Sequence, residues 1–307
     1  MGRWAWALAG CLAIAAIVAA DAGAAHPTGK RAAAVATRAR TINRADGRTA
    51  PPAAAEPAFL RELPAKLSVP GAGVGRQVLA AYGAMFVARG VRLPPEVIFP
   101  SSQACARWQA TVPQLRRRLA GQWVDLQVRP MQALLAAVAQ ARREGLRIAP
   151  RGEGSSRRTY AGTVALWHSR VDPGLRYWVS RRRLTPQRAQ TIRAMPIGQQ
   201  VGVILQLQTR GIFFSLHQHK SILYSVAAPG TSQHLAMLAL DVRDTGNPKL
   251  RHILEAHGWF QTVLSDTPHF TYLGVSQAEL PALGLQPVEW DGRRFWVPNL
   301  GPVHLPS

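Results

Sequence analysis

Two segments in the C-terminal half of the chain carry side chains that can bind a metal ion. The first contains His234 and Asp241, and the second contains Asp266 and His269. A catalytic zinc ion takes three protein ligands and keeps one position open for water, and histidine and aspartate are common donors at such sites. If the two segments form neighbouring strands, His234, Asp241 and His269 can converge on one zinc ion.

Asp266 stands three residues before His269 and can reach a zinc-bound water without being a ligand. Zinc lowers the pKa of that water and polarises a carbonyl, while a nearby carboxylate takes and passes the proton. This is the arrangement of metal-assisted hydrolysis. The alternative is that both histidines are ordinary core residues. Spacing alone leaves both interpretations open, because such a set is less specific than paired cysteine motifs.

The sequence around these residues resembles a known family. Residues 232–241 (SQHLAMLALD) resemble the Ser-x-His-x-x-Gly-x-Ala-x-Asp signature of the VanY-type zinc D-alanyl-D-alanine carboxypeptidases and of related LAS-type cell-wall and endolysin peptidases. Residues 266–274 resemble the family's Glu-Pro-Trp-His-Phe-x-Tyr-x-Gly segment, and residues 155–159 resemble its Ser-Gly-Tyr-Arg-Ser segment. The segments occur in the family's order, and the resemblance spans residues 126–274.

The resemblance implies one zinc ion per chain, bound by His234, Asp241 and His269, with Asp266 as general base. It also implies that Arg158 holds a substrate carboxylate or the developing oxyanion. An arginine suits this role because its planar guanidinium binds a carboxylate through two parallel hydrogen bonds. The implied activity is hydrolysis of peptidoglycan stem peptides by a D-Ala-D-Ala carboxypeptidase. An endopeptidase that cuts inside the stem would use the same metal site, so that alternative stays open.

Three further residues are expected to contact the substrate. Ser232 matches the first position of the signature. Trp259 and Tyr272 are aromatic side chains near the expected site and can form a wall of the substrate cleft, with core packing as their alternative role.

Two positions depart from the family's pattern. Met237 stands where the signature has Gly, which puts a bulky side chain into the metal-binding loop. Asp266 stands where the family has Glu and, being one methylene shorter, must be carried closer to the water. Small misplacements are costly in catalysis. These departures keep open the hypothesis of a catalytically inactive relative that binds wall peptides.

The apolar pattern predicts an α+β fold, in which a small antiparallel sheet carries the zinc site, flanked by helices and by an N-terminal helical extension. Side chains at helical spacing predict helices over residues 77–89, 103–119, 131–144, 185–194 and 248–257. Alternating or short apolar runs predict strands over residues 146–149, 238–242 and 269–274 and a strand hairpin over residues 201–225. In that hairpin His217 and His219 would face one side, as surface or packing residues or as a second metal site. Asp291-Gly292 predicts a hairpin turn near the C-terminus.

Four regions are expected along the chain. Residues 1–25 combine a basic start, an apolar run and a small-residue site, which predicts a signal peptide or an N-terminal anchor. Residues 26–57 have almost no large apolar side chains, which predicts a disordered basic linker. Residues 58–125 are expected to be the helical extension, and residues 126–307 the zinc peptidase domain. The protein is therefore expected to be exported to the periplasm or cell envelope.

The chain is strongly basic, with a formal net charge of +21. The electrostatic field of such a charge attracts polyanions. For an exported protein the expected partners besides peptidoglycan are therefore anionic wall polymers or a membrane surface, and not nucleic acid. A compositional bias towards arginine is the other explanation. A basic polyanion-binding protein without enzymatic activity therefore stays a third hypothesis.

Signal cleavage would remove Cys11 and leave Cys105 as the one cysteine, so no intramolecular disulfide is expected. The chain is also expected to be a monomer.

Overall fold

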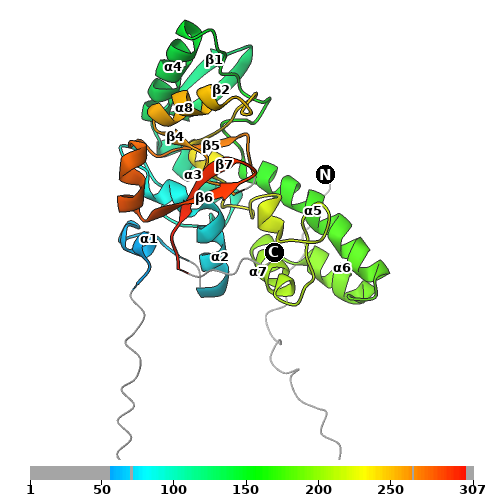
Figure 1. Ribbon diagram of the computed structural model, residues 1–307. Coiled ribbons are helices and arrows are strands. Elements are labelled where there is room, and N and C mark those ends of the chain that lie inside the picture. The colour runs from blue at the N-terminus through cyan, green and yellow to red at the C-terminus, as the bar shows by residue number, and fades with distance from the viewer. Residues whose placement is uncertain (1–55, 70–71, 265, 302–307) are drawn as a thin grey trace, which may run out of the picture. The chain divides into compact units, whose positions relative to one another are not determined.

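The computed structural model describes residues 56–69, 72–264 and 266–301 (Figure 1). The predicted signal peptide or anchor and nearly all of the predicted linker lie outside these residues. Within them the fold is α+β, as predicted, with helices around three small antiparallel sheets. No described helix is both long and apolar enough to cross a membrane. The predicted domain boundary after residue 125 stays a prediction.

The central sheet has three short antiparallel strands in the order β3, β5, β4. Their bounds are β3 (Ala239–Asp241), β5 (His269–Tyr272) and β4 (Trp259–Phe260). The register pairs Asp241 directly with His269. Opposite residues of an antiparallel pair project their side chains from the same face, so this register brings the two groups together.

One face of the central sheet packs against a hairpin and two helices, at the top of Figure 1. These elements are β1 (Gln114–Leu119), β2 (Gln122–Gln127), α4 (Val128–Arg143) and α8 (Pro248–Ala256). Trp259 of β4 and Phe270 of β5 are fully buried in this core. The side chain of Asn247 caps α8 by accepting the Lys249 N–H, and Pro248 takes the first helical position.

The opposite face of the sheet packs on a second core, which joins N-terminal helices to a C-terminal hairpin. These elements are α1 (Ala58–Arg61), α2 (Ala72–Tyr82), η1 (Gly83–Val87), α3 (Ser102–Thr111), η4 (Gln277–Leu283), β6 (Leu285–Trp290) and β7 (Arg293–Pro298). Phe260, next to Trp259 on β4, belongs to this second core, as the alternation of side chains along a strand requires. Asp291 and Gly292 close the β6–β7 hairpin with φ of 49° and 66°, which confirms the predicted turn.

A third core holds a group of helices beside the sheet layers. These elements are α5 (Tyr160–Ser180), α6 (Pro186–Ala194), α7 (Ile197–Gln208) and η2 (Ile222–Tyr224). The side chains of Thr159 and Thr185 cap α5 and α6 by accepting backbone N–H groups. Tyr82 at the end of α2 also packs into this core and ties the helical group to the N-terminal helices.

Residues 201–225 do not form the predicted strand hairpin. Their first part belongs to α7, and the rest is loop with the short turn η2. The alternation of Leu205 and Leu207 with glutamines imitates a strand, but α7 is buried on more than one face, so both leucines are covered in a helix. His217 and His219 lie on this loop, both exposed, with ring centroids 6.1 Å apart.

Two other predicted elements are wrong. The helix predicted over residues 103–119 ends at Thr111, because Pro113 lacks an N–H and restricts the residue before it. Strand β1 follows, and a turn with positive φ at Ala120 and Gly121 joins it to β2. Residues 146–149 form no strand, and Pro150 makes only an isolated bridge to Val242.

The remaining predicted elements match the structure. Helices α4, α6 and α8 match the ranges predicted from helical spacing except at their ends, and β3 and β5 lie within the predicted strands. The helix predicted over residues 77–89 divides into α2 and the 3-10 helix η1. Helix α5, with 21 residues, is absent from the sequence prediction.

Candidate metal centre

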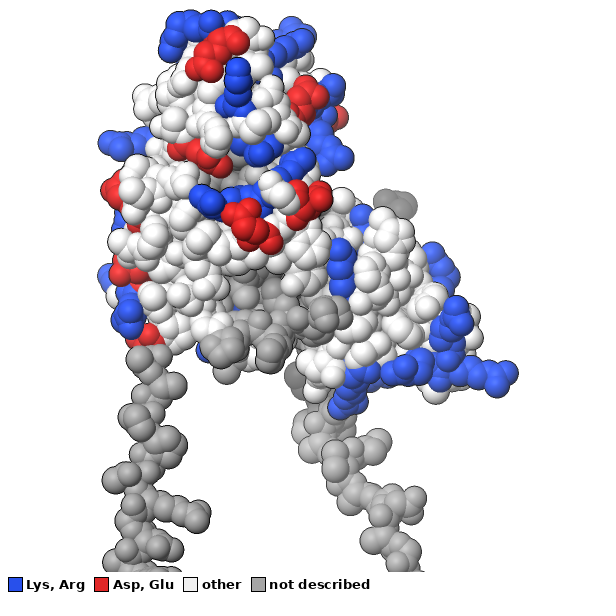
Figure 2. Space-filling model, in the orientation of Figure 1, with Lys and Arg blue, Asp and Glu red and all other residues white. Residues whose placement is uncertain are grey.

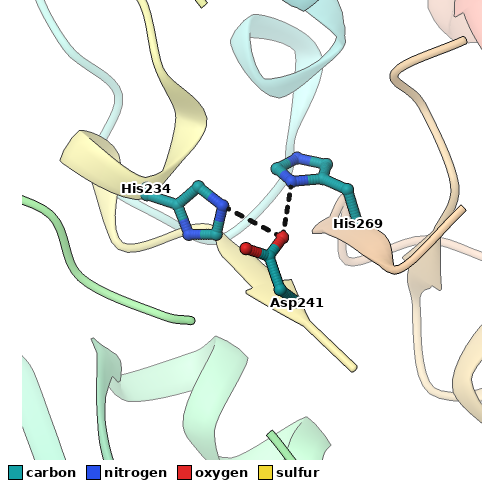
Figure 3. Close-up of side chains that lie close together, drawn as sticks. All are labelled: His234, Asp241 and His269. Carbon is teal, nitrogen blue, oxygen red and sulfur yellow. Dashed lines mark hydrogen bonds and ion pairs between the residues drawn. The ribbon is translucent and has the colours of Figure 1, made fainter. Parts of the chain in front are cut away.

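The structure brings the three predicted zinc ligands together. His234 lies on η3 (Gln233–Ala236), Asp241 is the last residue of β3, and His269 is the first residue of β5. One ligand atom of each lies within 4.8 Å of the other two, with the side chains pointing toward one another (Figure 3). The cross-strand register places Asp241 beside His269, and the turn after η3 brings in His234.

The Asp241 carboxylate lies between the two rings. Its Oδ1 is 3.2 Å from His234 Nε2 and 3.1 Å from His269 Nδ1 (Figure 3). Its Oδ2 accepts a hydrogen bond of 2.8 Å from Nη2 of Arg158. Arg158 thus fixes the carboxylate so that one oxygen faces both imidazoles.

The proton position on His234 follows from its neighbour. His234 Nδ1 lies 3.0 Å from the backbone carbonyl oxygen of Ser156, which can only accept, so Nδ1 carries the hydrogen. Nε2 of the neutral ring is then a bare nitrogen. It is buried and makes no hydrogen bond, although it lies within ion-pair distance of Asp241. A buried polar atom without a partner calls for an explanation, and coordination of a metal ion by Nε2 would supply one.

The tautomer of His269 is set by Gln233. The Gln233 amide nitrogen donates to the carbonyl oxygen of Tyr82 at 2.9 Å, which fixes the orientation of the amide. Its Oε1 therefore faces His269 Nε2 at 2.8 Å and also accepts the hydroxyl of Thr271. Because Oε1 can only accept, Nε2 of His269 carries a hydrogen, and in the neutral ring Nδ1 is the bare nitrogen that faces Asp241 Oδ1.

This donor set fits zinc. Two bare imidazole nitrogens and one carboxylate oxygen face a single point, and zinc prefers these donors. Zinc–ligand bonds of about 2.0–2.2 Å put the ligand atoms of a tetrahedral site about 3.3–3.6 Å apart. The observed separations of 3.1 and 3.2 Å are close to that spacing. Each histidine also has the second-layer acceptor that usually orients a metal ligand.

The protonation states suit metal binding. Burial lowers the pKa of His234, which keeps the ring neutral. The Arg158 guanidinium, which donates to Oδ2 of Asp241 at 2.8 Å, favours the ionised form of that carboxylate. A metal ion therefore has no proton to displace from either group.

A cavity of about 270 Å³ opens beside the ligands. Besides the three ligands, the predicted site residues on its wall are Arg158, Ser232 and Asp266. Asp266 is exposed to solvent, whereas Ser232 is buried. The six residues that the sequence motifs assign to metal, proton transfer and substrate therefore share one cavity.

Trp259 and Tyr272 do not line this cavity. Both are buried in the core beneath α4 and α8, with ring centroids 5.4 Å apart and the rings edge to face. Packing in the core of the central sheet accounts for the positions of both rings, so no contact with a substrate is needed to explain them.

Met237 adopts the left-handed conformation that a glycine would take at this position of the signature. Its φ and ψ are 55° and 35°, and it ends η3 just before β3. The side chain is fully buried and is not part of the cavity wall. The substitution therefore leaves the turn intact and does not fill the cavity beside the ligands.

Several residues of the site are not predicted from the sequence. Gln233 lies between two positions of the signature, so its placement beside a ligand histidine was available as a clue. Ser156 acts through its backbone, which the residue type does not reveal. Arg151 and Arg170 also line the cavity, but in an arginine-rich chain nothing in the linear sequence distinguishes them.

No protein-family model matches this chain, and no curated protein sequence matches it either. Two solved structures are similar to part of it. They are a variant of the vancomycin-resistance D,D-pentapeptidase VanY, from a VanB-type resistance cassette, in complex with Zn(II), and VanYB in complex with D-alanine-D-alanine. Each is 15% identical and covers 54% of this chain, with TM-scores of 0.31 and 0.32. The matches span 82% and 80% of those two chains.

Proposed function

We propose that this protein is a zinc-dependent peptidase that removes the terminal D-alanine from peptidoglycan stem peptides. The observation that carries the proposal is that one imidazole nitrogen each of His234 and His269 faces the same oxygen of Asp241, while the other nitrogen of each ring lies beside a hydrogen-bond acceptor. Three acceptors directed at one point repel one another unless a cation lies between them. The resemblance of the three sequence motifs supplies the substrate class.

The residues around the cavity divide the work of hydrolysis. A bound zinc ion supplies Lewis-acid polarisation of the scissile carbonyl and lowers the pKa of water. Asp266, exposed on the cavity wall, takes a proton from the attacking water and delivers it to the leaving amine. Arg158 offers positive charge to the substrate carboxylate or to the oxygen of the attacked carbonyl, and Ser232 offers a hydroxyl to the bound peptide.

The same proposal includes the setting of the enzyme. A signal peptide or anchor in residues 1–25 would put a monomeric enzyme in the periplasm or cell envelope, where its substrate is. An endopeptidase with this metal site and an inactive wall-binding relative are the alternatives. The aspartate at position 266 favours the inactive relative, because its side chain is shorter than that of a glutamate and must be carried closer to the water to act as a base.

Zinc content and D-alanine release from a wall pentapeptide test the proposal, using the full chain beside His269→Ala and Asp266→Ala. We expect about one zinc per wild-type chain, the stoichiometry of a single site, with activity lost in both variants. Only His269→Ala should also weaken zinc binding, which separates ligand from base. If the wild type binds zinc but releases no D-alanine, the alternatives are favoured. Hydrolysis of intact peptidoglycan would then distinguish the endopeptidase from the inactive relative. A wild-type protein that binds no zinc would contradict the proposal.

A further inference from the structure

The cavity beside the metal ligands carries an excess of positive charge. Its wall includes three arginines, Arg151, Arg158 and Arg170, but only two carboxylates, Asp241 and Asp266. A partly enclosed wall with this balance attracts an anionic ligand even before a metal cation is added.

Arg158 is already engaged with the protein. Its Nη2 donates to Asp241 at 2.8 Å, and its Nε donates to the carbonyl oxygen of Gly154 at 3.3 Å. Side chains of this pair are only 27% and 13% exposed. Moving the guanidinium onto a substrate would leave the carboxylate of a metal ligand without its counterion, which is costly in a largely buried place. Arg158 therefore acts mainly on Asp241, and the role of binding the substrate carboxylate, which the motif resemblance implies for Arg158, needs another cation.

Arg170 reaches the cavity from α5 and has no such partner. Its Nε donates to the hydroxyl of Ser225 at 2.8 Å, and its Nη1 donates to the hydroxyl of Ser169 at 2.9 Å. Among the described residues no carboxylate lies within ion-pair distance of Arg170, and its Nη2 makes no hydrogen bond. A half-buried guanidinium that neutral hydroxyls hold in place is preorganised for an anion.

Apolar side chains line part of the same cavity. The apolar residues that line the cavity are Leu166, Leu223, Val226, Ala227 and Val263. They suit methyl side chains, and a cavity of about 270 Å³ is of the size that admits a short peptide end.

We propose that Arg170 binds the C-terminal carboxylate of the substrate peptide, and that Arg158 is a positioning residue that orients Asp241 toward the metal. The inference rests on the proposed peptidase function and makes it more specific, because a carboxypeptidase needs a cation for a free C-terminus and an endopeptidase does not. Arg151 is the weaker candidate, since it is exposed and no hydrogen bond of its side chain holds it in place.

The test compares two wall pentapeptides that differ only at the end, one with a free C-terminal carboxylate and one with a C-terminal amide. Binding is measured by calorimetry on the zinc-loaded full chain carrying Asp266→Ala, so that the peptides stay intact. We expect the free acid to bind more tightly than the amide. Adding Arg170→Ala should weaken binding of the acid by about 10–100-fold and leave the amide unchanged, as loss of a charge-assisted hydrogen bond predicts.

Matched variants distinguish loss of the proposed carboxylate-binding subsite at Arg170 from a general loss of positive charge. Arg176→Ala removes an exposed arginine of the same helix that is not on the cavity wall, and should change neither affinity. Arg170→Lys keeps the charge without the fork and should restore part of the preference for the acid. Arg158→Ala should weaken zinc binding, measured against a chelator, and should lower the affinity for both peptides.

Two results would overturn the subsite. One is equal weakening of acid and amide by Arg170→Ala, and the other is loss of the preference in Arg151→Ala with Arg170→Ala unaffected. Failure of the peptidase function is recognised separately, by absent zinc and absent hydrolysis of both peptides. If Arg170→Ala removes the preference for the peptide with a free carboxylate, the subsite is supported even when neither peptide is hydrolysed.

Discussion

At the scale of single residues, the candidate metal site depends on which nitrogen of each imidazole carries the hydrogen. The signature supplies the histidines, but acceptors outside the ligand set choose the tautomers, namely the carbonyl of Ser156 and the amide of Gln233. Gln233 is the more informative case, because its own orientation is fixed by donation to Tyr82. It is fully buried, so water cannot replace it.

Replacing Gln233 by leucine should therefore weaken zinc binding. Without the amide oxygen, His269 Nε2 loses its acceptor and the ring is no longer held with Nδ1 toward the site. Loss of such a second-layer partner typically costs about 10–100-fold in metal affinity. Competition with a chelator measures the affinity, and ¹⁵N shifts of the metal-free protein report the tautomer of His269. Unchanged affinity together with an unchanged tautomer would contradict the role assigned to Gln233.

Gln200 offers a matched control. It is also fully buried, accepts from the ring nitrogen of Trp167 at 2.8 Å and donates to the carbonyl oxygen of Ile192 at 2.9 Å. It lies in the helical group, not on the cavity wall. Gln200→Leu should lower the free energy of unfolding as Gln233→Leu does, by leaving buried polar groups unpaired, but should leave zinc affinity unchanged.

At the scale of elements, the turn at Met237 joins η3 to β3 and so sets the distance between His234 and Asp241. A left-handed backbone costs an L-residue about 1–2 kcal/mol, whereas truncating a buried Met costs about 2–5 kcal/mol. Met237→Gly should therefore relieve strain yet lower the free energy of unfolding, by on the order of 2 kcal/mol. Urea denaturation measures the change. A more stable variant would show that strain outweighs burial at this turn.

Ala120 is the control for the same backbone conformation without burial. It has φ of 48°, is exposed, and sits in the turn between β1 and β2. Ala120→Gly should leave the free energy of unfolding unchanged or raise it by up to about 1 kcal/mol, because strain is relieved while glycine loses more entropy on folding.

The elements also show how far the sequence predicts this fold. Helices with a clear cap or an opening proline, such as α6 and α8, are predicted because their signals are local. Helix α7 is not, because its burial on several faces comes from packing against α5 and η2, which no local pattern records. The ligand set of the site is predicted through its motifs. Arg170 and Ser225 are not, because only the fold brings α5 to the cavity.

At the scale of the whole molecule, the positive charge is unevenly distributed. Residues 154–240 contain eleven Lys and Arg residues and one carboxylate, Asp172. Figure 2 shows Lys and Arg side chains along the outer edge of the helical group, at the lower right. The exposed triplet Arg181, Arg182 and Arg183 lies in the turn between α5 and α6. A surface whose charges are of one sign suits binding of an anionic wall polymer. A uniform bias in composition would instead spread the positive charge evenly over the chain.

Reversing the triplet to glutamate, as Arg181→Glu, Arg182→Glu and Arg183→Glu together, should weaken binding to a phosphate polymer. Inorganic polyphosphate on a column is a suitable probe, with the salt concentration at elution as the measure. The control reverses Arg116, Arg117 and Arg118 on β1, the same change in net charge at another exposed triplet, where Asp125 lies 3.8 Å from Arg116. We expect earlier elution chiefly for the 181–183 variant. Equal shifts for both variants would mean that binding follows net charge and that the helical group is no docking surface.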